Sequence, residues 1–396
     1  MPHVKKRYAI GKLKKKLSFA RVVAIQGPRQ CGKSVLATRL LGEALPRPVV
    51  VRFDDLRVRR FAQENPDLFL LENRDARPLI IDEAQKVPEI FDAIKLRVDE
   101  DVSPGRYLIL GSTEFSTLFR VRESLTGRLS RLCLHPLCLA ESHQLPQKKS
   151  DLAGGFLSLK PRLTLTDVLK GFEQGGMPGI FTVRSEEERD ALFEDWVQLT
   201  CTRDVLQIPR LRINPDMARA VLESIATAKA PELAEISKAV GATPKVVEKI
   251  LKALKELFVI EALRPHATST GKERYYLCDA GIARFLGADR QRVLETWILQ
   301  EFLVKKDLLP LPSKVRLTHY RNPKGSRIPF IIEDVVHGAT YAVRPLYAEK
   351  ADLRDIKILE SFCKRVGGKT ESFLLLADPA IRSLGGAKVM SWTSVV

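Results

Sequence analysis

Short apolar runs alternate with longer amphipathic segments along the first third of the chain. Apolar residues dominate positions 22–25, 48–53, 79–81 and 106–110, and the segments between them place apolar side chains at helical spacing. A short run that is apolar throughout is typical of a strand buried in a parallel sheet. The alternation therefore predicts an α/β fold in which helices cover both faces of a mostly parallel sheet.

The loop between the first predicted strand and the next helix has a phosphate-binding pattern. Residues 27–34 read G-x-x-x-x-G-K-S, and such a loop leads into a helix whose free N–H groups and dipole attract phosphate. We expect Lys33 to reach the β- and γ-phosphates of ATP and the Ser34 hydroxyl to bind Mg²⁺. The predicted nucleotide contacts are Gly27, Pro28, Arg29, Gln30, Cys31, Gly32, Lys33, Ser34 and Val35.

Two carboxylates, Asp82 and Glu83, follow the third apolar run. A carboxylate at a strand tip can hold the Mg²⁺ of a bound nucleotide, so we assign Asp82 to the metal and Glu83 to the attacking water. Ser112 and Thr113 follow the fourth run, and the carboxyl ends of parallel strands meet at one edge of a sheet. Ser112 would hydrogen-bond the γ-phosphate or its attacking water; the alternative is a turn that only ends the strand.

Arg128 is the candidate for a catalytic arginine. It follows a predicted helix, and a guanidinium at this point could reach the nucleotide of a neighbouring subunit as an arginine finger. Arginine is abundant in this chain, and spacing alone leaves Arg131 as an alternative.

The pattern changes after residue 142. A polar, glycine-containing stretch at 142–165 predicts a linker or the entry to a lid, and the segment 186–207 is helical in pattern. These features predict a linker or lid entry after the first domain, followed by a helix.

Residues 216–278 predict a winged helix-turn-helix. Three amphipathic helices are expected, with Thr243 as the N-cap of the third and Pro244 in its first turn. Two apolar runs then flank a polar loop, as the strands of a wing would. Lys245, Lys249 and Lys252 would face outward from the third helix toward DNA, and the alternative is a winged helix used for packing or protein contact.

Composition narrows the class of protein. Of the 396 residues, 45% are apolar and 29% are charged, a composition typical of globular proteins. A chain of this length is too long for a single hydrophobic core. No apolar run approaches the ~18 residues of a membrane span, and the basic N-terminus lacks the apolar core of a signal peptide, so we expect a cytoplasmic protein. The net charge of +17 suggests nucleic acid as an anionic partner, although a solvated basic surface would give the same charge.

One cluster of possible zinc ligands is present. Cys133, His135, Cys138 and His143 are close in sequence, but we interpret the apolar run between them as a strand and not as a metal site.

Several motifs occur in the order found in a large family of prokaryotic AAA+ ATPases. They are Gly-Pro-Arg-Gln-Cys-Gly-Lys-Ser at 27–34, Phe-Asp-Asp at 53–55, Ile-Asp-Glu-Ala-Gln-Lys-Val-Pro at 81–88, Gly-Ser-Thr at 111–113, Leu-Thr-Gly-Arg at 125–128, and His-Pro-Leu at 135–137 leading to Glu141. The chain resembles this family over nearly its whole length. The resemblance implies an AAA+ core with Ser112 and Thr113 at the polar sensor position and Arg128 as the finger. It also implies a homo-oligomer, and AAA+ relatives are often hexamers.

The last part of the chain is similar to that family's terminal domain of uncharacterised function, which has a restriction-endonuclease-like fold. Active members of that fold need an Asp at the start of one strand and Glu-x-Lys on the next. The corresponding positions here hold Pro329 and Val343-Arg344-Pro345, which lack the acidic ligands and the lysine. We therefore expect no nuclease activity, and the alternative is a Mg²⁺ site rebuilt from Glu295, Glu333 and Glu349.

The resulting expectation is a chain of four parts. Residues 1–145 form an AAA+ P-loop ATPase core, 146–215 a helical lid or linker, 216–278 a winged helix-turn-helix, and 279–396 an α/β restriction-endonuclease-like domain without nuclease activity. The expected function is Mg²⁺-dependent ATP hydrolysis coupled to binding and remodelling of DNA, branched DNA included. The alternative is a nucleotide-dependent switch that acts on a protein partner in defence or regulation.

Overall fold

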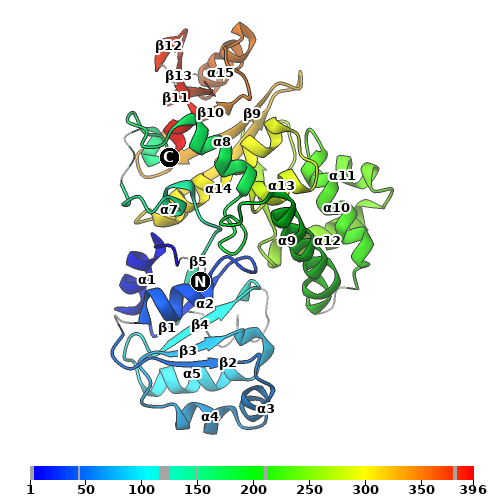
Figure 1. Ribbon diagram of the computed structural model, residues 1–396. Helices are drawn as coiled ribbons and strands as arrows, with labels where there is room; N and C mark the ends of the chain where they lie inside the picture. The colour runs from blue at the N-terminus through cyan, green and yellow to red at the C-terminus, as the bar shows by residue number, and fades with distance from the viewer. Residues whose placement is uncertain are drawn as a thin grey trace. The chain divides into compact units, whose positions relative to one another are not determined.

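The computed structural model divides into two compact units (Figure 1). It describes residues 4–42, 45–115, 125, 127–148, 150, 152–208, 212–377 and 381–396. The first unit comprises residues 1–135 with 256–258, and the second comprises residues 136–255 and 259–396. No helix of the described residues is both long enough and apolar enough to cross a membrane.

In the described part of the first unit, five parallel strands form one sheet in the order β2-β3-β4-β1-β5. The strands are β1 (Val22–Gln26), β2 (Val49–Arg52), β3 (Leu79–Asp82), β4 (Tyr107–Gly111) and β5 (Leu129–Cys133). The predicted parallel α/β sheet is confirmed. Because the strands are parallel, the ends of β1, β3 and β4 meet at one edge.

Helices cover both faces of this sheet (Figure 1). They are α1 (Ala9–Leu17), α2 (Lys33–Val35) continuing as the π-helix η1 (Leu36–Leu40), α3 (Leu56–Glu64), α4 (Pro66–Glu72), the 3-10 turn η3 (Ala84–Lys86) and α5 (Ile90–Glu100). Side chains alternate along β1: Ala24 packs in the cluster with α3, α4 and α5, whereas Val23 and Ile25 pack with α1 and η1. Because successive side chains of a strand point to opposite faces, this apolar strand contributes to two cores, one on each face of the sheet.

Two details of the sheet correct the sequence expectations. The run at 48–53 was expected to be a buried strand, but β2 lies at the sheet edge, and Val49 and Val50 are each 39% exposed. The strand near Cys133 ends at that residue, and the apolar segment after it is loop. Pro136 in this segment has no N–H to donate to a neighbouring strand, which disfavours continuation of the strand.

The second unit begins with helices. These are α7 (Leu139–Ser142), η5 (Ala153–Gly155), α8 (Leu165–Gln174), α9 (Glu186–Leu199), η6 (Thr200–Asp204), η7 (Val205–Gln207), α10 (Pro215–Thr227), α11 (Leu233–Ala239), α12 (Pro244–Glu256), α13 (Ala280–Phe285) and α14 (Arg290–Leu308). Asp279 fastens two of these segments, since its carboxylate accepts from the N–H of Gly176 at 2.6 Å and of Gly281 at 2.9 Å. A Cβ on Gly175 would lie 2.2 Å from Asp279 Oδ1, so only glycine fits this turn.

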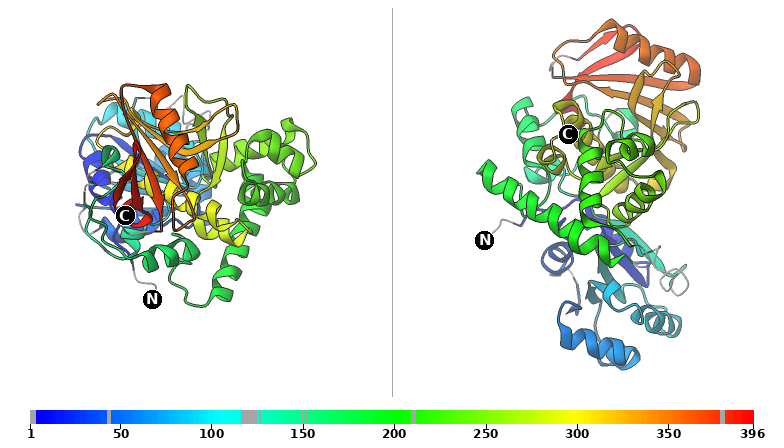
Figure 2. Two further views of the ribbon diagram at one scale, coloured as in Figure 1. Left: turned by 90° about the horizontal axis from the view of Figure 1, so that it is seen from above. Right: turned by 90° about the vertical axis from the view of Figure 1, so that its right-hand side faces the viewer.

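In the described part of the second unit, eight strands form a mixed sheet in the order β12-β13-β11-β10-β9-β8-β6-β7. They are β6 (Ile260–Pro265), β7 (Arg274–Leu277), β8 (Val315–Arg321), β9 (Arg327–Asp334), β10 (Ala339–Pro345), β11 (Lys369–Leu376), β12 (Arg382–Leu384) and β13 (Ala387–Ser391), with η8 (Pro312–Lys314), α15 (Leu353–Val366) and η9 (Trp392–Val395) between or after them. Helix α15 packs its apolar side on this sheet (Figure 2). The two strands expected for a wing, β6 and β7, are paired antiparallel and belong to this sheet.

Candidate functional site

The P-loop of the first unit joins the end of β1 to α2 and bends sharply. Gly27 has φ of +154° and Gly32 has φ of +97°, values that L side chains rarely adopt. A Cβ on Gly27 would lie 2.1 Å from the carbonyl oxygen of Leu134, because the chain leaving β5 passes beside the loop. The strand, loop and helix therefore have the arrangement that the sequence predicted.

The Lys33 side chain lies inside the curve of this loop. It is buried, and its Nζ donates to the carbonyl oxygens of Gly27 at 2.9 Å and Pro28 at 2.8 Å. These two bonds hold the ammonium among the backbone atoms that would surround the phosphates of a bound nucleotide.

Ser34 and Asp82 come together from two elements at the same sheet edge. Ser34 Oγ on α2 donates to Asp82 Oδ2 at the end of β3, at 2.7 Å. The other carboxylate oxygen accepts from the Glu83 N–H at 3.1 Å, which fixes the orientation of Asp82. A hydroxyl and a carboxylate are the hard oxygen ligands that Mg²⁺ prefers, so these residues fit that ion.

Glu83 occupies an unusual backbone conformation at the strand tip. Its φ is +57°, which is uncommon for a residue with a Cβ and occurs often at functional sites. Burial raises the pKa of its carboxyl, and the nearby Lys33 ammonium acts in the opposite direction. The Glu83 carboxylate thus lies close to Lys33 and Asp82, where it could orient a water molecule.

The Glu83 carboxylate has two polar neighbours. The Gln85 amide donates to Glu83 Oε2, and the Ser112 hydroxyl at the end of β4 lies 3.5 Å from the same oxygen. Gln85 Nε2 is also 3.4 Å from Ser112 Oγ. The structure therefore brings Lys33, Glu83 and Ser112 to one edge, and it adds Gln85, to which the sequence analysis gave no role.

Thr113 helps to hold the backbone at this edge of the sheet. Its carbonyl oxygen accepts from the Gln26 side chain at 2.9 Å, so the last residue of β1 fixes the turn after β4. The Thr113 hydroxyl is buried and has no hydrogen-bond partner within the described ranges.

Arg128 does not join this cluster in its own chain. It immediately precedes β5, and Leu129 pairs with Val22 at the opposite end of β1 from the P-loop. Four steps from residue to residue along β1, about 13 Å, separate these ends. Arg128 forms a bidentate pair with Asp99, with Nε–Oδ1 and Nη2–Oδ2 distances of 2.6 and 2.9 Å, and this hydrogen bonding lowers the pKa of Asp99.

A cleft of about 630 Å³ borders Arg128 and is lined by Phe19, Ala20, Arg21, Gly127, Arg128, Leu129 and Ser130. Nη1 of Arg131, the alternative arginine finger, lies 3.3 Å from Glu114 Oε1. Thr126 of the Leu-Thr-Gly-Arg motif, and most of the helix predicted before it, lie outside the described residues.

The three candidate lysines of the second unit are on the exposed side of α12. Lys245, Lys249 and Lys252 are exposed, and their spacing of four and three residues places them on one face of the helix. In the part of the chain that the structure describes, none of them forms an ion pair. Their common face is therefore basic and open to solvent.

The loop between β6 and β7 is fastened to β8. His266 N–H donates to His319 O at 2.8 Å, and Thr270 N–H donates to Arg321 O at 2.9 Å. Arg321 N–H in turn donates to Ser269 Oγ at 2.9 Å. The polar loop expected at the tip of a wing is thus attached to the C-terminal sheet.

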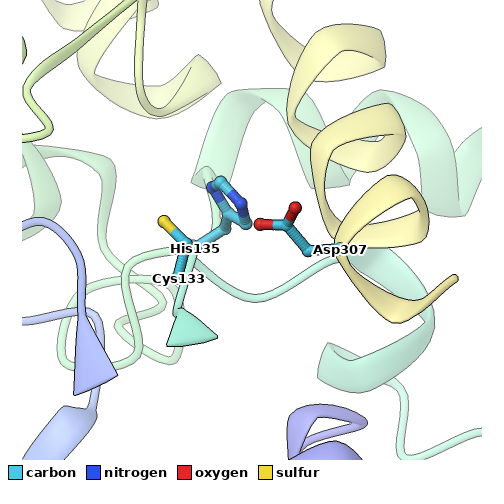
Figure 3. A group of neighbouring side chains, drawn as sticks. All are labelled: Cys133, His135 and Asp307. Carbon is cyan, nitrogen blue, oxygen red and sulfur yellow. The ribbon is translucent and has the colours of Figure 1, made fainter. Parts of the chain in front are cut away.

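The possible zinc ligands belong to both units. Cys133 ends β5 and His135 follows it in the first unit (Figure 3), whereas Cys138 caps α7 in the second. His143 Nδ1 lies 3.0 Å from the carbonyl oxygen of Leu139. Figure 3 also labels Asp307, which belongs to α14.

The C-terminal positions compared with a nuclease site lie on neighbouring strands. Pro329 is in β9, and Val343 of β10 pairs with Phe330 next to it. Glu295, an alternative Mg²⁺ ligand, instead accepts from buried Arg274 at 3.0 Å. Glu333 accepts from Thr318 Oγ1 at 3.2 Å.

Family comparisons match two separate segments. Residues 20–143 match the model of an AAA domain, AAA_14, and residues 166–292 match a domain of unknown function, DUF8612. The chain is also 27% identical over 345 residues to uncharacterized proteins of Mycobacterium bovis and Mycobacterium tuberculosis, with 83% of this chain and 71% of each relative covered.

Solved structures give weaker likenesses. The Walker-type ATPase of Pyrococcus abyssi is 14% identical with a TM-score of 0.45, covering 72% of this chain and 96% of its own. A RuvB variant of Thermotoga maritima is 14% identical with a TM-score of 0.31, covering 64% and 85%. The match over residues 20–143, together with the P-loop and the parallel sheet, supports an AAA-type ATPase domain in the first unit.

Proposed function

We propose that this protein is a Mg²⁺-dependent AAA+ ATPase that uses ATP hydrolysis to bind and remodel nucleic acid. The observation that carries the ATPase activity is the 2.7 Å hydrogen bond between Ser34 Oγ and Asp82 Oδ2. It brings together a P-loop hydroxyl and a strand-tip carboxylate, the two oxygens from which a nucleotide-bound Mg²⁺ is held in P-loop ATPases.

Each residue of the cluster has a role in this proposal. Lys33 would bind the β- and γ-phosphates, and Ser34 and Asp82 would hold the metal ion. When bound, Mg²⁺ would neutralise charge on the phosphate oxygens. Glu83 orients and polarises the attacking water, and Ser112 hydrogen-bonds that water or the γ-phosphate. The backbone of residues 27–35 surrounds the phosphates.

Steady-state phosphate release from ATP tests the proposal. We expect Lys33→Ala to lose nucleotide binding and hydrolysis together. Glu83→Gln should retain nucleotide binding and lower kcat by about 100-fold or more, the usual range for a catalytic base. Lys14→Ala, on the exposed side of α1, is the matched control and should hydrolyse ATP at the wild-type rate. Equal rates for wild type and Glu83→Gln would contradict the proposed activity.

Nucleic acid is proposed as the partner because of charge. The chain carries a net charge of +17, and the exposed face of α12 presents Lys245, Lys249 and Lys252 in a helix order that resembles a winged helix-turn-helix. The assay is therefore repeated with single-stranded, duplex and four-way-junction DNA. Strong stimulation by one form, absent in Glu83→Gln, would identify the substrate.

We further propose that the protein acts as a homo-oligomer, in which Arg128 serves the nucleotide of a neighbouring subunit. Support comes from the position of Arg128 at the end of the sheet opposite to its own P-loop. The second unit is proposed to have a restriction-endonuclease-like fold over α14, β8 to β10, α15 and β11. Without acidic ligands at Pro329 and Val343, it would serve as a platform and not as a nuclease.

One observation favours a second function, a nucleotide-dependent switch acting on a protein partner. The loop between β6 and β7 is bound to β8 by backbone hydrogen bonds, so it is not free to enter a DNA groove as a wing does. In this case ATP turnover would be slow and equal with every form of DNA. That result would contradict remodelling and direct the search to protein partners.

A further inference from the structure

One tight turn places the Gln85 side chain next to the catalytic carboxylate of Glu83. The left-handed backbone at Glu83 leads into the 3-10 turn η3, which is closed by hydrogen bonds from Lys86 N–H to Glu83 O at 3.0 Å and from Val87 N–H to Ala84 O at 3.2 Å. This turn places the side chain of Gln85 beside that of Glu83, two residues earlier. The contact is thus determined by the backbone of the strand tip.

The orientation of the Gln85 amide follows from its partner. A carboxylate oxygen only accepts hydrogen bonds, so the amide nitrogen of Gln85 must face Glu83. The amide oxygen, Oε1, is then buried without a hydrogen-bond partner in the described ranges. A buried acceptor without a donor destabilises a fold, so the bond to Glu83 is made at a cost in stability.

The neighbouring strand leaves room for this amide. A Cβ on Gly111, the last residue of β4, would lie 2.9 Å from Gln85 Oε1 and 2.4 Å from the ring of Phe115. Any other residue at this position would therefore push against the amide. Gly111 immediately precedes Ser112, so the same strand end both admits Gln85 and carries the polar residue next to it.

We propose that Gln85 is a positioning residue for ATP hydrolysis, which holds the Glu83 carboxylate against Ser112 in the orientation needed to align the attacking water. This inference rests on the proposed ATPase function. The Gln85 amide lies 3.4 Å from Ser112 Oγ while it donates to Glu83, so it links the ends of β3 and β4. A movement of Ser112 in response to the γ-phosphate would be passed to Glu83 through this amide.

Gln85→Met separates this role from a structural one. Methionine is similar to glutamine in length and volume, but it lacks the donor and the unpartnered oxygen. We expect kcat to fall by about 10-fold or more, since a misplacement of about 1 Å can lower a rate by about 100-fold. KM for ATP and the affinity for a non-hydrolysable analogue should change by less than about 3-fold, and Tm should not fall.

The same substitution made in the Glu83→Gln variant tests whether Gln85 acts through Glu83. In Glu83→Gln the carboxylate is absent, so adding Gln85→Met should change the residual rate by less than about 2-fold. The control is Gln198→Met, the same change at an exposed position of α9, which should behave as wild type.

Two outcomes would overturn the inference, and they are distinguishable. In the first outcome, wild type hydrolyses ATP well above the rate of Glu83→Gln, but Gln85→Met either matches wild type or has an effect that adds to that of Glu83→Gln. This result would contradict the role of Gln85 and retain the ATPase function. A wild-type rate equal to that of Glu83→Gln would refute the ATPase itself, and the role of Gln85 with it.

Discussion

Asp167 shows how one carboxylate can make the stability of a helix depend on pH. It accepts from Thr164 Oγ1 at 2.7 Å and Thr164 N–H at 2.9 Å at the start of α8, and these hydrogen bonds hold the pKa of Asp167 below its usual value. A carboxyl whose pKa is lower in the folded state stabilises the fold above its unfolded pKa, and this contribution is lost as pH falls through the folded pKa. Asp167→Asn should therefore lower the free energy of unfolding at pH 7 by about 1 kcal/mol.

Below the folded pKa of Asp167, wild type and Asp167→Asn should have the same stability, because the wild-type residue is then neutral too. Urea denaturation of both proteins over a series of pH values from 7 downward measures this difference, which should shrink as pH falls below the unfolded pKa. Thr164→Ala provides the control, since Asp167→Asn should have a smaller effect when its hydroxyl partner is absent. A difference between the two proteins that stays constant over the whole pH series would show that charge is not the cause.

Individual site residues differ in how far the sequence reveals them. Lys33, Ser34, Asp82 and Glu83 are local: each position follows from a strand end and a motif, and the structure places them together. Gln85 lies in the motif at 81–88, but no role follows from that motif, because its contact depends on a left-handed residue that turns the chain back onto Glu83. The pairing of Arg128 with Asp99 joins residues 29 positions apart, and periodicity says nothing about it.

At the scale of elements, the basic face of α12 carries a testable expectation. Changing Lys245, Lys249 and Lys252 to Ala should weaken DNA binding and make the salt dependence shallower, since each lost phosphate contact changes the slope of log affinity against log salt by about 0.9. The control removes the same charge elsewhere, by changing exposed Lys357, Lys364 and Lys369 to Ala. Fluorescence anisotropy with a labelled duplex at several salt concentrations measures both slopes. Equal slopes for the two triple variants would exclude α12 as the contact.

Elements were predictable where apolar runs determine them, but their neighbours were not. The run at 48–53 reads the same whether its strand is central or at an edge, and the sheet order made β2 an edge. The local pattern predicts the strands β6 and β7. Their place in the C-terminal sheet depends on β8 (Val315–Arg321), which begins 38 residues after β7 (Arg274–Leu277) ends. Strand pairing over such a separation is decided by tertiary packing, and propensity does not encode it.

For the whole molecule, the proposed role of Arg128 predicts that one chain does not complete its own site. If Arg128 acts on a neighbouring nucleotide, Lys33→Ala and Arg128→Ala should each be inactive alone and should complement each other when mixed. In a 1:1 mixture that exchanges subunits freely, about a quarter of interfaces pair an intact Lys33 with an intact Arg128 from the next chain, so about a quarter of wild-type activity should return. Asp99→Asn, which removes the carboxylate that pairs with Arg128, should remain active in the same assay. A mixture no more active than the sum of its components, at concentrations where oligomers form, would instead require a catalytic arginine other than Arg128.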